Sequence, residues 1–477
     1  MEGKSIAKNT AFMTIASVGQ KVISFVYFTL IARNIGAEGT GKYFFALSFT
    51  TVFVVFIDLG LTQVLIREGA KGKDRLQKYF SSVLFTKIFL GVITYLLALL
   101  VINIMGYPVE TKHLVYLSAI TMLFDSLHLT IYGVLRAIGN LKYEAIAITA
   151  SQFMTLILGT TCLYLKMPLI WLIAAFTIPS FLNVVYSATV LFKKYKIRFQ
   201  PKLDKQALRF MALIAIPFAL TAIFGRVYSY IDSILLSKLA GDIAVGWYSI
   251  PYKITYAFQF MPLALVAALY PKFSEYFEKD KEKLSYIFER GMKYLLIIVF
   301  PIAIGIGVLA RDIILSLYTA EYINSILPLQ ILLAGLIFSY VSFPIGAFLN
   351  ACNRQITQTV IVFFVMVINI ILNLILIPRI GVVGAAVSAL VGNFCLTLFG
   401  YLVMPSITKI SHWFLFKSFL QIFISAIVMG LVVYFINQIS HYTVAILIGA
   451  AIYPIMLFVT RAITTEQLKE ALVLVKK

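Results

Sequence analysis

Apolar runs of about 20 residues follow one another along almost the whole chain, and this pattern limits the fold more than any other feature. A helical run of that length crosses the roughly 30 Å hydrocarbon core of a bilayer. Hydrophobic residues make up 61% of the 477 residues and charged residues only 13%, which is more apolar than a soluble protein of this size requires. The sequence therefore predicts an all-α polytopic membrane protein. About fourteen transmembrane helices are expected, at residues 11–32, 43–64, 81–104, 114–135, 144–165, 169–191, 209–237, 245–270, 291–316, 325–349, 357–377, 382–404, 413–436 and 442–460.

The placement of basic residues supports this set of spans, because short cytoplasmic loops of membrane proteins are enriched in Lys and Arg. With the N-terminus inside the cell, 29 of the 40 Lys and Arg residues fall in cytoplasmic segments and seven fall on the opposite face. We therefore expect a multi-pass protein of the cytoplasmic membrane with both termini in the cytoplasm. The net charge of +20 is attributed to this topology and to attraction by anionic lipids, so no nucleic-acid partner is implied.

Two stretches of the chain, IARNIGAEGTGKYFFAL and LSKLAGDIAVGWYSI, share a pattern of glycine and tyrosine. Gly36 and Gly41 lie 205 positions before Gly241 and Gly246, and a tyrosine follows each pair two residues later. We interpret each stretch as a helical hairpin at the outer face, where glycine permits a tight turn. The chain is thus predicted to contain a duplication.

The duplication predicts two six-helix lobes of the same orientation. The N-lobe is expected at residues 1–192 and the C-lobe at residues 210–404, with a basic cytoplasmic linker at 193–209 between them. Residues 405–477 supply two further helices and a cytoplasmic tail. Parallel repeats of this kind usually meet across a central cavity that holds the substrate near the middle of the membrane.

Charged side chains within the predicted spans are candidates for function, because their exposure to lipid is costly. The set comprises the basic residues Lys21, Arg226 and Lys253, the acidic residues Asp58, Asp125 and Asp232, and His128. Lys21, Asp125 and Arg226 lie on polar stripes with helical spacing. These stripes either line an aqueous cavity or form hydrogen bonds and ion pairs between helices, and His128 either handles a proton or is a satisfied buried histidine. Lys87 and Glu144 lie near the cytoplasmic ends of their spans, so we expect them to snorkel to the surface.

Patterns of catalytic chemistry are missing from the sequence. It has no Gly-rich phosphate loop, no HExxH, no nucleophile elbow and no paired carboxylates outside the spans. We therefore expect no catalytic residues, no cofactor and no metal site, and we look for function between the helices.

Four segments carry a resemblance to a known family when taken in order: IARNIGAEGTGKYFFALSF, FIDLGLTQVLIRE, VLRAIGNLKYEAI and DSILLSKLAGDIAVGWYSIPYK. They resemble polysaccharide biosynthesis (O-antigen type) flippases of the multidrug/oligosaccharidyl-lipid/polysaccharide exporter superfamily, over roughly residues 5–405. The resemblance implies a V-shaped, alternating-access transporter that moves a polyprenyl-diphosphate-linked oligosaccharide outward across the membrane. It also implies membrane lipids, a coupling ion (H⁺ or Na⁺), and glycosyltransferases or a glycan polymerase as partners.

The resemblance also suggests roles for the charged set. Because a diphosphate needs positive charge in a path of low dielectric, we predict that Lys21, Arg226 and Lys253 bind it. The candidates for ion coupling are Asp58, Asp125, His128 and Asp232. Related lipid-linked peptidoglycan precursor flippases carry basic residues in spans 1, 2 and 8, whereas this chain has Asp58 in span 2. That substrate and a cation-coupled multidrug antiporter, which would use Asp58 and Asp125, remain as alternatives.

Overall fold

The computed structural model describes residues 2–197, 199 and 205–464. Parts of the predicted linker at 193–209 and of the C-terminal tail therefore lie outside the described residues. Within them the chain forms helices joined by short turns, and twelve helices are long and apolar enough to cross a membrane. The predicted fold class, an all-α polytopic membrane protein, is confirmed.

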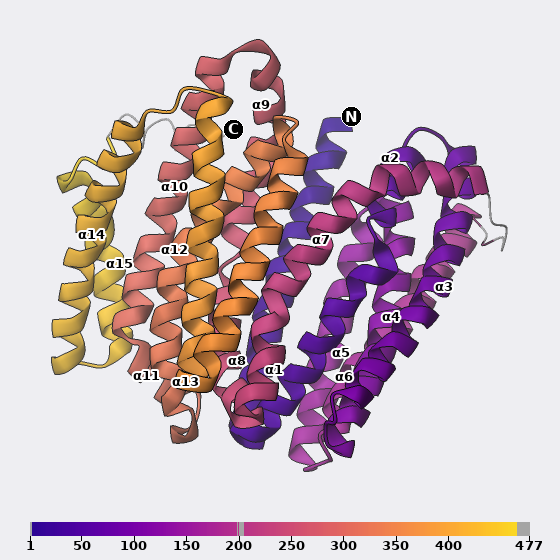
Figure 1. The fold of residues 1–477 in the computed structure, drawn as a ribbon, viewed down its shortest axis with the longest axis horizontal. Coiled ribbons are helices and arrows are strands. Elements are labelled where there is room, and N and C mark those ends of the chain that lie inside the picture. The colour runs from indigo at the N-terminus through magenta and orange to yellow at the C-terminus, as the bar shows by residue number, and fades with distance from the viewer. Residues whose placement is uncertain (1, 198, 200–204, 465–477) are drawn as a thin grey trace. The chain divides into compact units, whose positions relative to one another are not determined.

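Two helices each contain two spans. Helix α1 (Glu2–Asp58) has 57 residues and α13 (Gln355–Val403) has 49, whereas about 20 residues suffice to cross a bilayer. The backbone leaves helical geometry at Gly36 in α1 and at Ile380 and Gly381 in α13. Figure 1 shows two limbs on either side of these kinks. When each limb of α1 and α13 is counted as one span, the twelve helices account for the fourteen predicted spans.

The chain divides into two compact units, residues 1–249 and 250–477. After α1, unit 1 contains α2 (Leu61–Gly69), α3 (Lys73–Ile104), α4 (Val109–Ala137), α5 (Lys142–Tyr164), α6 (Ile170–Tyr195), α7 (Lys205–Ala240) and the start of α8 (Asp242–Ala257). The predicted span at 43–64 is wrong at its end, because Leu59 and Gly60 have φ angles of 42° and 79°. Helix α1 therefore stops at Asp58, and α2 begins as a separate helix.

Unit 2 contains the rest of α8, α9 (Phe260–Lys279), α10 (Lys281–Val308), α11 (Ala310–Leu317), η1 (Ala320–Ser325), α12 (Ile326–Ala351), α13, η2 (Met404–Ser406), α14 (His412–Ile439) and α15 (Tyr442–Val459). The predicted span at 245–270 is interrupted between Ala257 and Phe260. The hydroxyl of Tyr340 donates a hydrogen bond to the carbonyl of Phe258, at 2.7 Å. This bond satisfies a backbone acceptor at the break, which would be costly to leave unpaired in a membrane.

The division between the units falls within α8 rather than at the predicted linker. Helix α7 packs against α1, so α7 and the second glycine hairpin belong to unit 1. The lobe boundaries derived from the sequence stay predictions.

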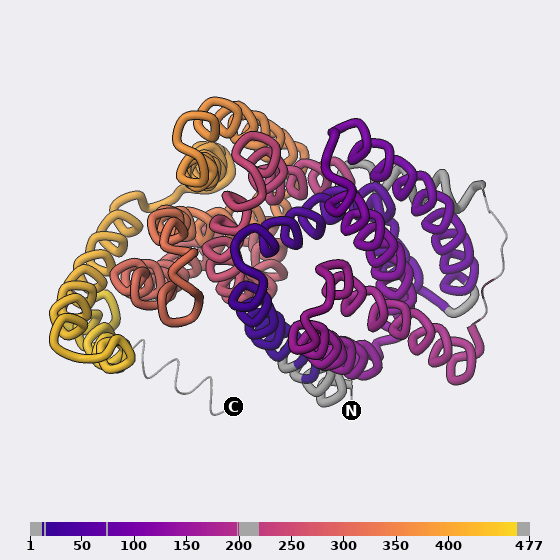
Figure 2. Tube along the Cα trace, turned by 90° about the horizontal axis from the view of Figure 1, so that it is seen from below, coloured from indigo at the N-terminus to yellow at the C-terminus, as the bar shows by residue number. Residues whose placement is uncertain are grey.

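The two C-terminal helices pack on α10 of unit 2. Figure 2 shows them in yellow beside α10. The hydroxyl of Tyr453 in α15 donates to the carbonyl of Ile297 at 2.8 Å, and the amide of Asn437 in α14 donates to Asp312 at 2.8 Å. These bonds give both helices a fixed place in unit 2.

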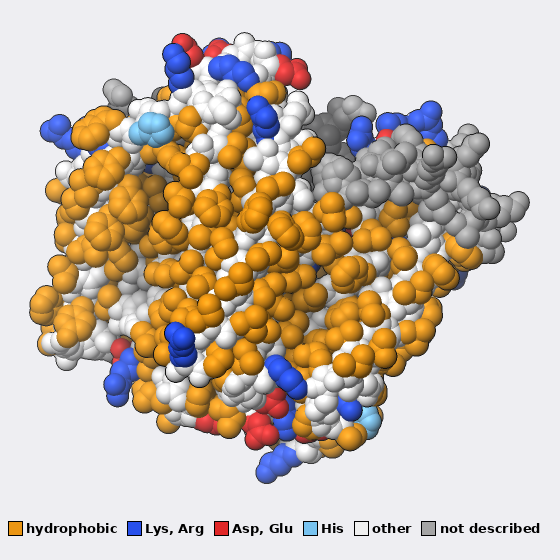
Figure 3. Space-filling view, viewed as in Figure 1, with side chains coloured by type: hydrophobic (Ala, Val, Ile, Leu, Met, Phe, Trp, Pro, Cys, Tyr) orange, Lys and Arg blue, Asp and Glu red, His pale blue; other side chains and the backbone are white. Residues whose placement is uncertain are grey.

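The surface has the distribution that a bilayer requires. On the face drawn in Figure 3, hydrophobic side chains cover a broad central band, and charged side chains gather toward the two ends of the helices. This arrangement matches an apolar belt flanked by two aqueous boundaries.

Candidate functional site

Arg226 is an exposed guanidinium within the spanning part of α7. It forms no ion pair or hydrogen bond with a described residue. A cation in such a position requires water or an anionic ligand, because lipid cannot solvate it. Lys21 is half-buried on α1, which packs against α7 in unit 1. Lys253 is half-buried on the part of α8 that belongs to unit 2, so convergence of the three cations stays a prediction.

Asp232 has a partner other than Arg226. Its side chain is 5% exposed, and its Oδ2 accepts a hydrogen bond from the hydroxyl of Tyr248 at 2.9 Å. This bond links α7 to α8 within unit 1. The alternative in which Arg226 forms an ion pair between helices therefore gains no support from the described contacts.

Asp58 forms an ion pair with Lys87, with 2.5 Å between Oδ1 and Nζ. Lys87 also donates to the hydroxyl of Thr62 at 2.8 Å, and that hydroxyl donates to Asp58. Lys87 is only 2% exposed, so the expectation that it snorkels to the surface is wrong. The chain turns between Asp58 and Lys87, so that the two side chains meet and their opposite charges compensate each other.

Glu144 was also expected at the surface, and this expectation is wrong too. Its side chain is fully buried and pairs with Arg136 at the end of α4. The turn between α4 and α5 places the two side chains together, so burial of the carboxylate is compensated by the guanidinium.

The polar stripe of α4 faces α6. Three pairs of polar side chains join the two helices: Thr121 with Thr177, Asp125 with Ser180, and Tyr132 with Asn183. Each partner on α6 lies three residues after the previous one, as one helix face requires. This stripe therefore contributes hydrogen bonds between helices, which was one of the two interpretations of the sequence pattern.

Asp125 and His128 retain features that suit ion handling. The side chain of Asp125 is 48% exposed, and its Oδ1 lies 3.8 Å from Nδ1 of His128. That ring nitrogen is buried and has no hydrogen-bond partner among the described residues. Among the described residues, no group of three His, Cys, Asp or Glu side chains is placed to hold a metal ion.

The repeated glycines form a crossed contact between the two copies of the repeat. Gly36 and Gly241 have φ angles of 71° and 84°, which favour glycine. A Cβ on Gly41 would lie 1.8 Å from the carbonyl oxygen of Asp242, and a Cβ on Gly246 would lie 2.0 Å from that of Ala37. Ala37 and Asp242 are themselves 205 positions apart. Each copy therefore presents the same glycine to the same carbonyl of the other copy, as in a two-fold symmetric contact.

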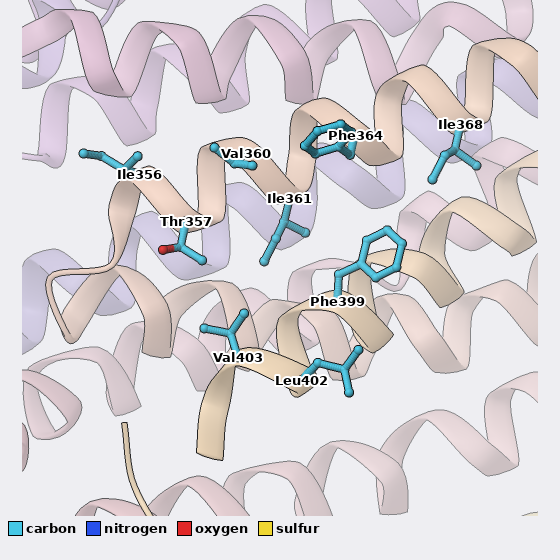
Figure 4. A pocket seen from close by; sticks show the side chains of 9 residues that line it. All are labelled: Ile356, Thr357, Val360, Ile361, Phe364, Ile368, Phe399, Leu402 and Val403. Atoms are coloured by element: carbon cyan, nitrogen blue, oxygen red, sulfur yellow. The ribbon is translucent and has the colours of Figure 1, made fainter. Parts of the chain in front are cut away.

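A groove of about 570 Å³ lies between the two limbs of α13 (Figure 4). Its lining consists of Ile356, Thr357, Val360, Ile361, Phe364, Ile368, Phe399, Leu402 and Val403. Thr357 supplies the single hydroxyl of this lining, so the groove offers little to a sugar or a diphosphate. Its surface suits hydrocarbon, and we do not assign it to the polar part of a substrate.

Comparison with known protein families decides the classification. The model of the polysaccharide biosynthesis protein family matches residues 6–277, which is more than half of the chain. The chain belongs to the polysaccharide biosynthesis protein family. The MatE family model also matches residues 217–375. The resemblance noted in the sequence is therefore confirmed.

Relatives of this family member include named glycan proteins. It is 23% identical over 396 residues to the capsular polysaccharide biosynthesis protein CapF of Staphylococcus aureus, covering 82% of this chain and 96% of the relative. It is 21% identical to the probable low-salt glycan biosynthesis flippase Agl15 of Haloferax volcanii, covering 80% of each chain. Among solved structures, lipid II flippase MurJ in an inward closed conformation matches with a TM-score of 0.75 and 19% identity, covering 93% of this chain and 97% of that one. The last match shows a shared fold.

Proposed function

We propose that this protein is a flippase that moves a polyprenyl-diphosphate-linked oligosaccharide across the cytoplasmic membrane by alternating access. Membership of the polysaccharide biosynthesis protein family and the names of its glycan relatives support this function. The observation that carries it is Arg226, an exposed cation within a spanning helix that has no described anionic partner. A transported anion would supply that partner.

The diphosphate is the group that needs protein contacts most. Transfer of its charge through a low-dielectric path requires compensation, and a guanidinium can bind two phosphate oxygens at once. We assign this role to Arg226, with Lys21 and Lys253 as additional point charges. The proposal requires all three cations to reach the same diphosphate, while contacts to the sugars can remain loose.

Asp125 and His128 are the preferred candidates for ion coupling. Asp125 is half-exposed beside a histidine nitrogen that lacks a hydrogen-bond partner, so a proton or Na⁺ can change the charge of this pair. Asp58 and Asp232 stay as secondary candidates, because each already has a partner in Lys87 or Tyr248.

The proposed substrate also implies a location and partners. Lipid-linked oligosaccharides are assembled at the cytoplasmic membrane, so we place the protein there with both termini in the cytoplasm. Glycosyltransferases that build the substrate, or a polymerase that uses it, are the expected neighbours. We assign this protein a role in transport and propose no enzymatic step for it.

Transport by the purified full-length protein in proteoliposomes tests the proposal. Sugars of a polyprenyl-diphosphate-linked oligosaccharide should become accessible to an added glycosidase faster than in protein-free vesicles, and an imposed H⁺ or Na⁺ gradient should change the rate. An organic cation should not be transported. Gradient-driven transport of the cation without movement of the oligosaccharide would instead establish the multidrug antiporter. Movement of a lipid-linked peptidoglycan precursor alone would establish the other alternative.

A further inference from the structure

Two cations in α10 share one aromatic ring of α14. The ammonium of Lys293 lies 5.9 Å from the centre of the Phe414 ring, and the guanidinium carbon of Arg290 lies 5.0 Å from it. Arg290 also lies over the ring of Tyr286, at 5.1 Å. Helices α10 and α14 pack against each other within unit 2, so this arrangement belongs to a single unit.

Lys293 is buried without an anionic partner. Its side chain is only 5% exposed, and it has no hydrogen bond or ion pair with a described residue. A buried ammonium is costly unless it is paired and hydrogen-bonded. The face of Phe414 attracts the cation, but an aromatic ring accepts no strong hydrogen bond from its N–H groups. The neighbouring positive charge of Arg290 increases the need for an anion.

The acidic residue beside Arg290 in the sequence is engaged elsewhere. Oε1 of Glu289 accepts hydrogen bonds from the backbone N–H of Ser411 at 2.7 Å and from the hydroxyl of Ser285 at 3.2 Å. These bonds fix the start of α14 to α10. Glu289 forms no ion pair with Arg290 or Lys293 among the described contacts, so the positive charge of the two residues remains available.

The surroundings identify the level of this cluster in the membrane. Large aromatic side chains of the same two helices are exposed, with Trp413 72% exposed, Phe416 58% and Tyr286 57%. Exposed aromatic residues near the ends of spanning helices gather at the depth of lipid headgroups. The N-terminus of α14, the positive end of a helix dipole, lies at the same place. At the depth of the headgroups, the membrane itself supplies the phosphate groups of its anionic lipids.

We propose that Arg290, Lys293 and Phe414 form a binding site for the phosphate of an anionic membrane phospholipid. The guanidinium and the ammonium donate hydrogen bonds to the phosphate oxygens, while the ring of Phe414 holds both cations in place. The acyl chains extend along the apolar surface next to α14. This site uses none of the cations Lys21, Arg226 and Lys253 that are assigned to the diphosphate, and it holds a resident lipid rather than the substrate.

Native mass spectrometry and thermal unfolding of the full-length protein in neutral detergent test this site. Phosphatidylglycerol should bind to the wild type more tightly than phosphatidylcholine and should raise its melting temperature more. Arg290→Gln and Lys293→Met should each weaken phosphatidylglycerol binding roughly tenfold to a hundredfold, as expected when a charged hydrogen bond is lost. Lys279→Gln removes a lysine that is 70% exposed and paired with Glu275, and this control should leave phosphatidylglycerol binding unchanged.

The behaviour without lipid separates a ligand site from a structural role. Because Lys293→Met removes a buried, unpaired charge, the variant should melt at or above the wild-type temperature in neutral detergent while losing its response to phosphatidylglycerol. An equal response to phosphatidylglycerol in wild type and variants would overturn the proposal. So would the same stabilisation by inorganic phosphate alone, since the site would then bind a free anion rather than a lipid.

Discussion

Adding one methyl group to Gly41 should destabilise unit 1, because the crossed contact of the two repeat copies leaves no room for it. The Cβ would lie 1.8 Å from the carbonyl oxygen of Asp242, whereas real Cβ contacts are essentially never shorter than 3.0 Å, so the two segments must separate by about 1.2 Å. Overpacking of this kind costs up to about 3 kcal/mol, offset by at most ~1 kcal/mol from the higher helix propensity of alanine. The net cost of Gly41→Ala is then about 2 kcal/mol, or roughly 4–8 °C in melting temperature for a unit of this size.

A double-mutant cycle tests the geometry more sharply. Gly246→Ala pushes the same two segments apart, from the other end of the contact, where a Cβ would lie 2.0 Å from the carbonyl oxygen of Ala37. Once the segments have separated, the second methyl group needs little further movement, so the double variant should cost clearly less than the sum of the single variants. The control is Gly19→Ala in the same helix, because a Cβ there meets no atom within 4 Å. Melting curves of purified protein measure all four variants. Additive costs, or a Gly41→Ala variant as stable as the Gly19→Ala control, would refute the crossed contact.

Three further outcomes are expected. Lys87→Met should destabilise the protein by about 3 kcal/mol. This is the low end of the range for breaking a buried ion pair, because Asp58 is 32% exposed. In thermal unfolding, the double variant with Lys87→Met and Asp58→Asn should lose less stability than the two single variants lose together. Hydrogen bonding by the backbone N–H of Lys283 lowers the pKa of Asp280 at the start of α10. The stabilisation by the Asp280 carboxylate should be fully present above about pH 3.9 and should disappear as the pH falls through the lower pKa of the folded state. The melting temperatures of wild type and Asp280→Ala should therefore converge in acid. A cysteine at Lys71, in a background without native cysteines, should react with an impermeant reagent only after the cells are permeabilised, and labelling of intact cells would contradict the cytoplasmic topology.

Features encoded locally could be predicted from the sequence. Runs of apolar residues identified the spans, because a bilayer imposes their length. The pairs Gly36 and Gly241, and Gly41 and Gly246, were found because the duplication repeats them, and their left-handed or closely packed backbone explains why glycine stands there. The chain's family followed from the order of these motifs.

Features that depend on which helices face each other could not be predicted in this way. The pairing of Lys87 with Asp58 requires α3 to place its lysine against the end of α1. In the sequence, the one indication of this pairing is that both residues lie near the cytoplasmic ends of their spans. The stripe of α4 predicted a polar face but not its partner, α6. At the break between α8 and α9, the carbonyl of Phe258 is satisfied by Tyr340, which lies about 80 residues farther along the chain.

The most direct test of the account compares the transport rate of a polyprenyl-diphosphate-linked oligosaccharide in proteoliposomes containing wild type or cation variants. Loss of one charged hydrogen bond, worth about 1.5–3 kcal/mol, should slow transport by Arg226→Ala roughly tenfold or more, and Arg226→Lys should recover part of the rate. Arg311→Ala should transport as the wild type does. The structure ends the predicted span 291–316 at Val308, so this exposed arginine lies in the short helix α11, outside the spanning helices. A variant lacking the charges of Lys21, Arg226 and Lys253 should melt as a folded protein and show no transport above protein-free vesicles. Transport at the wild-type rate by that folded triple variant would contradict the proposed diphosphate site.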